Sequence, residues 1–123
     1  MAEAAWITVL VADDEPDMRA LVRAVLGMRD EFTIVGEAED GEDAWEQWRA
    51  KRPDVLVLDQ RMPRGTGMEI AARIRQEDRD QPIILFTAYL NGEALAMAED
   101  CDVRPIDKRD VSDLPDAIIK LAR

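Results

Sequence analysis

The stretch VLVADDEPDMR, from Val9 to Arg19, places two adjacent carboxylates directly after an apolar run. The residues from Trp6 to Ala12 are mostly apolar and β-favouring, which predicts a short buried strand. The residues that follow have Pro16 near a first turn and Gly27 near a stop, which predicts a helix. Asp13 and Asp14 therefore lie between a strand and a helix. The apolar residues at helical spacing are Met18, Leu21, Val22, Val25 and Leu26.

The same alternation of strand and helix continues to the end of the chain. Strict alternation predicts an α/β fold: a doubly wound parallel sheet of five strands with five helices and right-handed crossovers, in the flavodoxin-like order 2-1-3-4-5. Pro105 cannot donate to a sheet ladder, so we expect the last strand at an edge. The further strands are FTIVGEA, DVLVLD, PIILFTA and CDVRPID, and the further helices are Asp40 to Arg52, Gly67 to Glu77, Asn91 to Glu99 and Val111 to Ala122, the last with Ser112 as a candidate cap.

Composition limits the possible functions. The 123 residues contain 47% apolar and 35% charged residues and no low-complexity tract, which predicts one folded domain over residues 1–123. The formal net charge of -11 disfavours direct binding of nucleic acid by this chain, and no apolar run is long enough for a membrane span. The single cysteine, Cys101, agrees with a reducing compartment, so we expect a cytoplasmic protein. The absence of histidine excludes catalytic triads that contain histidine and zinc sites that have histidine ligands.

Acidic, hydroxyl and basic side chains follow different predicted strands. Asp13 and Asp14 follow the first strand, Asp59 ends the third, Thr87 lies at the end of the fourth and Lys108 follows the fifth. In the order 2-1-3-4-5 these carboxyl ends converge on one rim of the sheet. Each close pair of carboxylates would cost roughly 4 kcal/mol at an effective dielectric constant near 20. A cation must offset this repulsion, and oxygen ligands with open positions favour Mg²⁺.

A hard cation beside a carboxylate also suggests a reaction. It could neutralise phosphoryl oxygens while Asp59 attacks in line and becomes an acyl phosphate. Thr87 could then donate its hydroxyl to one phosphoryl oxygen, and Lys108 could pair with another. The added charge could draw Thr87 and its loop into a second position, which is the behaviour of a switch.

The chain resembles the receiver domains of bacterial two-component response regulators. The motifs VLVADDEPDMR, DVLVLDQRMPRGTGMEI and PIILFTAY and the downstream Lys108 carry this resemblance along essentially the whole chain. The resemblance implies that Asp59 is the phosphoacceptor, that Asp14 binds Mg²⁺ directly and Asp13 through water, and that the backbone carbonyl of Arg61 is a further ligand. It also implies a phosphohistidine donor, on a sensor histidine kinase or a histidine phosphotransfer protein. Thr87 and Lys108 resemble the switch hydroxyl and the phosphate-pairing lysine, and Ala88 resembles the small residue that admits the phosphoryl group.

The resemblance also implies the kind of output. Such a domain is a switch, not an enzyme beyond its own phosphorylation and dephosphorylation, and acts on a downstream protein, a fused effector domain or a second copy in a homodimer. Two positions depart from the family pattern. Pro105 occupies the place of the usual aromatic switch residue, and Arg109 replaces a common proline. We therefore expect the output to run through the loop after Thr87 and the fourth helix, with Tyr89 or Leu90 as reporters.

Two other functions remain open at the level of sequence. Singly, the same residues have structural interpretations: an isolated Asp-Asp pair as turn or cap, and an isolated Lys108 as a surface charge. A receiver-like module that binds partners without phosphorylation would fit Pro105. A phosphatase of the haloacid dehalogenase type would also attack phosphate from an aspartate, but that family has an acid two residues after its nucleophile, where this chain has Arg61.

Overall fold

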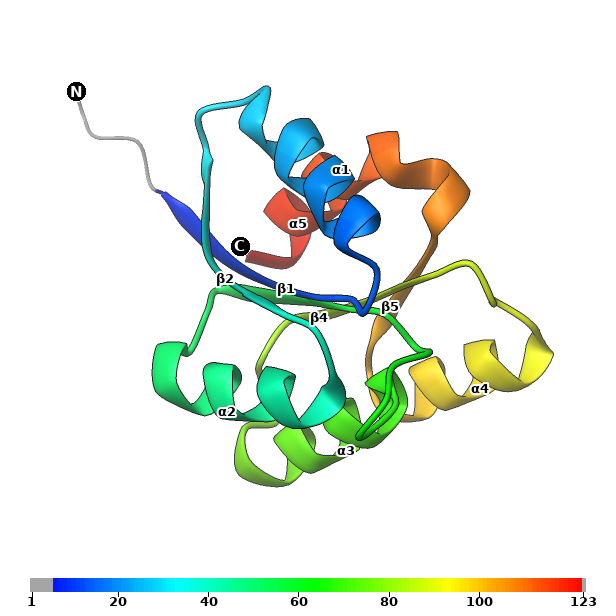
Figure 1. Cartoon of the computed structure of the whole chain (residues 1–123). Helices are drawn as coiled ribbons and strands as arrows, with labels where there is room; N and C mark the ends of the chain where they lie inside the picture. The colour runs from blue at the N-terminus through cyan, green and yellow to red at the C-terminus, as the bar shows by residue number, and fades with distance from the viewer. Residues whose placement is uncertain (1–5, 123) are drawn as a thin grey trace.

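A computed structural model describes residues 6–122 of the chain. Five parallel strands form one sheet in the order β2-β1-β3-β4-β5, which confirms the predicted flavodoxin-like topology. Helices α1 and α5 cover one face of this sheet, and α2, α3 and α4 cover the other (Figure 1). The elements are β1 (Ile7–Ala12), α1 (Pro16–Gly27), β2 (Phe32–Ala38), α2 (Gly41–Lys51), β3 (Val55–Leu58), α3 (Gly67–Glu77), β4 (Ile83–Thr87), α4 (Gly92–Asp100), β5 (Arg104–Asp107), the 3₁₀ helix η1 (Lys108–Asp113) and α5 (Leu114–Ala122).

Alternating side chains of the central strands build two separate cores. Successive side chains of a strand point to opposite faces. In β3, Val55 and Val57 therefore pack with α1 and α5, whereas Leu56 and Leu58 pack with α2, α3 and α4. All four are buried, as expected for a central strand with helices on both faces. The helices thus hold the carboxyl ends of the strands in fixed positions.

The tryptophans of α2 pack inside the protein. Trp48 is fully buried and Trp45 is 6% exposed, and the indole nitrogen of Trp48 donates to the buried Oε1 of Gln81 at 2.9 Å. This agrees with their sequence-based interpretation as packing groups.

The two edges of the sheet are β2 and β5. Pro105 lies in β5, where it pairs with Leu85 of β4, which confirms the prediction of an edge strand. On the other edge, the register of β2 shifts between Ile34 and Gly36. Near this irregularity the Lys51 ammonium, at the end of α2, donates to the carbonyl of Val35 at 2.8 Å.

Two details of the sequence-based assignment were wrong. The first strand begins at Ile7, and Trp6 is 58% exposed rather than part of it. Ser112 does not cap the last helix. It lies inside η1, which Asp107 caps by accepting from the amide of Arg109, and α5 begins only at Leu114.

Candidate functional site

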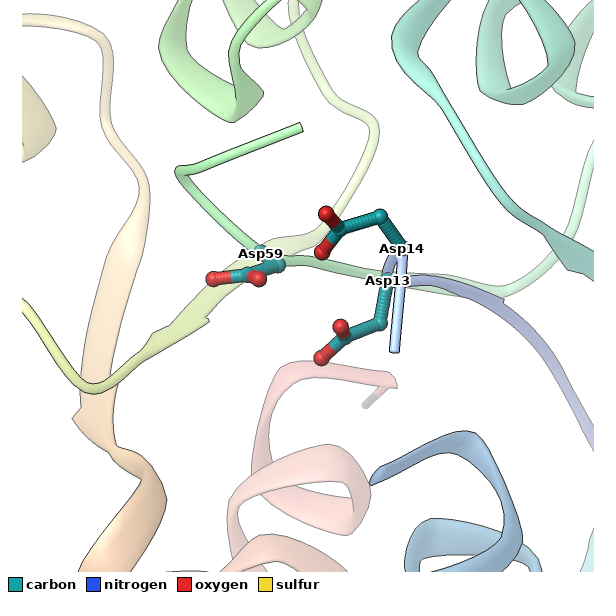
Figure 2. Close-up of side chains that lie close together, drawn as sticks. All are labelled: Asp13, Asp14 and Asp59. Atoms are coloured by element: carbon teal, nitrogen blue, oxygen red, sulfur yellow. The ribbon is translucent and has the colours of Figure 1, made fainter. Parts of the chain in front are cut away.

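Three carboxylates meet at the carboxyl ends of two neighbouring strands. Ala12 of β1 pairs with Leu58 of β3, and the amide of Asp59 donates to the carbonyl of Ala12 at 2.9 Å, so the residues after both strands lie side by side. One carboxylate oxygen from each of Asp13, Asp14 and Asp59 lies within 4.8 Å of the others. Figure 2 shows Asp13 and Asp14 extending from the end of β1 beside Asp59. Asp13 and Asp59 are buried, and Asp14 is exposed.

Lys108 lies among these acids. Its ammonium is 2.7 Å from Asp13 Oδ2, 3.2 Å from Asp59 Oδ2 and 3.4 Å from Glu15 Oε1. Burial alone would lower the pKa of Lys108, but the hydrogen bond to Asp13 and the charge of Asp59 outweigh it and hold that pKa above its ordinary value. The lysine therefore carries a positive charge between the two buried carboxylates.

The carboxyl of Asp59 is held in an unfavourable place for a negative charge. Burial raises its pKa, and the charge of Asp13 raises it further, while Lys108 and a hydrogen bond with Thr87 act in the opposite direction. The net effect is a pKa above the ordinary value, so one lysine does not fully compensate the acids. Further positive charge at this place would favour the ionised, nucleophilic form.

Thr87 ends β4 at the same rim of the sheet. Its side chain is fully buried, and its hydroxyl oxygen accepts from the amide of Tyr89 at 3.3 Å. The hydroxyl hydrogen can therefore be donated to another acceptor at this rim, and Thr87 is close enough to lower the pKa of Asp59 slightly. Ala88, which follows, is exposed.

The loop after Asp59 is ordered by its own hydrogen bonds. The amide of Gln60 donates to Asp59 Oδ1 at 2.8 Å, and the Gln60 side chain accepts from the amide of Met68 at 2.9 Å at the start of α3. A Cβ on Gly67 would overlap the backbone carbonyl of Asp59, so this glycine allows α3 to approach the end of β3. Thr66 and Glu69 form a capping box that fixes the same helix end.

Arg61 contributes a side-chain contact that the sequence did not predict. Its guanidinium lies 3.7 Å from the ring centroid of Tyr89, which connects the β3–α3 loop to the β4–α4 loop. Its backbone carbonyl accepts no hydrogen bond from any residue within 6–122. The role of that carbonyl as a metal ligand stays a prediction.

Two residues that lie near the acids were not predicted from the sequence to belong to the site. Glu15 is a third carboxylate near Lys108, and Arg19 of α1 donates to the backbone carbonyl of Asp13 at 2.6 Å. Glu15 is adjacent to the acid pair, which was an available signal. Arg19 lies one helical turn into α1, and its long side chain reaches back to the loop. Its second partner, Glu37 on β2, is 18 residues away in sequence, so nothing in the sequence indicated this contact.

The donor set fits a small divalent cation. All three side chains offer hard oxygen ligands, and the exposed position of Asp14 leaves the cluster open to solvent on one side. Mg²⁺ is commonly bound by one or two carboxylates with water and substrate phosphate in the remaining positions. The raised pKa of Asp59 is consistent with a place that is short of positive charge.

Comparisons with known proteins define the family. The model of the response regulator receiver domain matches residues 9–112. The transcriptional regulatory protein PdtaR of Mycobacterium tuberculosis is 36% identical over 118 residues, covering 89% of this chain and 54% of that protein. The nitrate/nitrite response regulator NarL of Escherichia coli K12 is 32% identical over 91 residues, covering 74% of this chain and 42% of that protein. The chain therefore spans about half the length, or less, of these relatives.

The solved structures agree. The signal receiver domain of the putative response regulator NarL from Mycobacterium tuberculosis superposes with a TM-score of 0.88 at 29% identity, covering 95% of this chain and 96% of that one. A two-component response regulator of the LuxR family from Aurantimonas has a TM-score of 0.89 at 27% identity, covering 95% and 85%. The chain belongs to the response regulator receiver domain family.

Membership in this family disfavours both alternatives left open by the sequence: a haloacid dehalogenase-type phosphatase and a module that ignores phosphorylation. None of the helices within residues 6–122 is sufficiently long and apolar to cross a membrane.

Proposed function

We propose that Asp59 accepts a phosphoryl group from a phosphohistidine on a sensor histidine kinase or a histidine phosphotransfer protein. The observation that supports this most directly is the setting of Asp59: a buried carboxylate with a raised pKa, 3.2 Å from the Lys108 ammonium. A carboxylate oxygen of Asp59 attacks phosphorus, the phosphorus–nitrogen bond of the donor breaks, and the leaving imidazole takes up a proton.

The residues around Asp59 have separate roles in this proposal. Asp13, Asp14, Asp59 and the backbone carbonyl of Arg61 would hold Mg²⁺, with Asp13 acting through water. The ion, when bound, neutralises charge on the phosphoryl oxygens. Lys108 already lies between Asp13 and Asp59, so a short movement pairs its ammonium with a phosphoryl oxygen.

Thr87 couples the chemistry to the fold. Its hydroxyl donates to another phosphoryl oxygen while it still accepts from the amide of Tyr89. When the hydroxyl moves toward the phosphoryl group, the β4–α4 loop moves with it, and this changes the surface that is presented to a partner. Beyond the formation and hydrolysis of its own acyl phosphate, we assign no enzymatic turnover to the chain, and steady hydrolysis of phosphomonoesters would contradict this.

The partners follow from the same proposal. The formal charge of -11 repels a phosphate backbone, so the output is a protein contact: a downstream partner, an effector domain of a longer protein, or a second copy in a homodimer. A cytoplasmic location fits a phosphohistidine donor and the single cysteine.

Incubation with a small phosphodonor and Mg²⁺, followed by intact-mass measurement, tests the chemistry. We expect an adduct of about 80 Da, one phosphoryl group, that is absent in Asp59→Asn and without Mg²⁺. Asp116→Asn is the matched control, because Asp116 lies on α5 with an 83% exposed side chain that pairs with Arg29, away from the acid cluster. An adduct that persists in Asp59→Asn, or that requires no divalent ion, would contradict the proposal.

A further inference from the structure

Arg19 links three elements around the acid-bearing loop. Its side chain begins on α1, donates through one terminal nitrogen to the backbone carbonyl of Asp13 at 2.6 Å, and through Nε to Glu37 Oε1 on β2 at 3.2 Å. The side chain is 18% exposed and that of Glu37 is 25% exposed, so solvent competes only partly for these contacts. Because a guanidinium is planar and its donors are fixed, two simultaneous contacts determine its orientation.

The contact with Asp13 restrains one particular peptide group. The amide of Asp13 donates to the carbonyl of Ala38 at 3.0 Å, and its carbonyl accepts from Arg19, so both sides of the residue are held. The carbonyl of Asp13 lies in the same rigid plane as the amide of Asp14. Arg19 therefore fixes the plane from which Asp14 extends.

Asp14 depends on this backbone restraint. Its exposed carboxylate has no hydrogen bond or ion pair with any residue in the described range 6–122. The carboxylate of Asp13, in contrast, is held directly, by the Lys108 ammonium at 2.7 Å and by the amide of Glu15 at 2.9 Å. Asp14 thus owes its position near Asp59 to the backbone alone.

We propose that Arg19 is a positioning residue for the cation site: it holds the Asp13–Asp14 peptide so that the Asp14 carboxylate faces Asp59. This inference rests on the proposed function, because it assigns the cluster to Mg²⁺. Residues that orient metal ligands without touching the metal typically change metal affinity by about 10- to 100-fold when they are replaced.

The sign of the effect distinguishes positioning from simple charge. Arg19 is a positive charge near a cation site, so its removal by electrostatics alone would strengthen Mg²⁺ binding. A positioning role predicts the opposite: Arg19→Gln weakens Mg²⁺ binding about tenfold. Arg23 provides the matched control, since it pairs with the same Glu37 at 2.6 Å but does not contact the acid-bearing loop.

The experiment is a Mg²⁺ titration of the full chain, monitored through the amide chemical shifts of Asp14 and Gln60. Urea unfolding in the absence of metal is measured in parallel. We expect Arg19→Gln to raise the Mg²⁺ dissociation constant about tenfold and Arg23→Gln to leave it unchanged or lower. Arg19→Lys keeps the charge but cannot hold both acceptors as a planar fork, so it should also weaken binding, and it serves if Arg19→Gln does not fold.

Two outcomes would overturn the inference. One is an equal dissociation constant for wild type and the folded Arg19 variants; together with a loss of unfolding free energy, it would make Arg19 purely structural. The other is tighter Mg²⁺ binding by Arg19→Gln, which electrostatics alone predicts. Failure of the wild type to bind Mg²⁺ would instead refute the cation site of the proposed function.

Discussion

Within residues 6–122, the Lys108 ammonium is the one cation that forms ion pairs with the carboxylates of the buried Asp13 and Asp59. Removing it leaves the carboxylates of Asp13 and Asp59, which are 3% and 5% exposed, without a charged partner. Breaking a buried pair by deleting one partner is strongly destabilising. We expect Lys108→Gln to lower the free energy of unfolding of the metal-free protein by about 3 kcal/mol, as measured by urea denaturation in EDTA.

Mg²⁺ should recover part of this loss, because a ligand that binds only the folded state stabilises it by mass action. Lys120→Gln is the control, since Lys120 is an exposed lysine of α5, and it should change stability by less than about 0.5 kcal/mol. Equal stability of the Lys108 and Lys120 variants in EDTA would show that the acids do not depend on the lysine.

Asp59 gives a prediction about pH. Its pKa in the folded protein is raised, first by burial and then by the charge of Asp13. The folded state therefore holds the proton more tightly than the unfolded state, and the stability that this contributes is lost as pH rises through the raised pKa. In EDTA, Asp59→Asn should match wild type at acidic pH, where the Asp59 carboxyl is protonated, and become the more stable of the two as pH rises through the raised pKa.

Denaturation of both proteins across this pH range provides the measurement. Other titrating groups are common to both proteins and largely cancel in the difference. Saturating Mg²⁺ should abolish or reverse the advantage of Asp59→Asn, because the ion favours the ionised carboxylate. An advantage that is independent of pH would contradict the assigned cause.

At the scale of elements, the start of α3 presses against the end of β3. A Cβ at position 67 would overlap the backbone carbonyl of Asp59, and backbone cannot move aside as a flexible side chain can. We expect Gly67→Ala to lower the free energy of unfolding by about 2 kcal/mol, as overpacking does, and to slow phosphorylation of Asp59, since the displaced strand end carries the nucleophile.

Gly92→Ala is the matched control for this change. Gly92 also begins a helix, but a Cβ there would meet nothing within 4 Å. It should be neutral or stabilising by up to about 1 kcal/mol, through the loss of unfolded-state entropy. If both alanines have the same effect on stability and on phosphorylation, the contact between α3 and β3 does not position Asp59.

The elements differ in how far their sequences could predict them. The apolar runs of β1, β3 and β4, which alternate with helices along the chain, predicted the sheet. They also predicted the meeting of Asp13, Asp14 and Asp59, because the strand order places neighbouring ends together. The beginning of α5 was predicted wrongly, since η1 and α5 share one continuous helical pattern and only Pro115 in the first turn of α5 signalled the break. The register shift in β2 lies between Ile34 and Gly36, and the glycine within this strand was an available signal of a bulge.

The details of the site that the sequence missed share a physical cause. The contact of Arg19 with Glu37 and the contact of Arg61 with Tyr89 join segments 18 and 28 residues apart, through side chains that are ordinary surface residues in the sequence. Such contacts depend on how loops are placed by the finished fold. Residue type and spacing could therefore identify the reacting groups but not the side chains that hold them.

At the scale of the whole molecule, the site must reach a partner surface through one of the elements around it. β5 is poorly suited, because Pro105 has no aromatic side chain that could rotate between solvent and core. The β4–α4 loop is better connected: the Thr87 hydroxyl binds the amide of Tyr89, and the Tyr89 ring, 48% exposed, lies under the Arg61 guanidinium. Movement of Thr87 toward a phosphoryl group must therefore disturb the contact between the two loops.

We predict that phosphorylation changes amide chemical shifts most strongly from Thr87 to Glu99, including the Tyr89 ring, and only weakly in β5. The measurement compares NMR spectra of wild type with and without a small phosphodonor in Mg²⁺, with Asp59→Asn under the same conditions as control. Arg61→Gln removes the stacking contact and should produce part of the Tyr89 shift without phosphorylation. Shifts confined to Asp13, Asp14, Asp59 and Lys108 would mean that the acyl phosphate forms without reaching α4, because its charge is then compensated within the site.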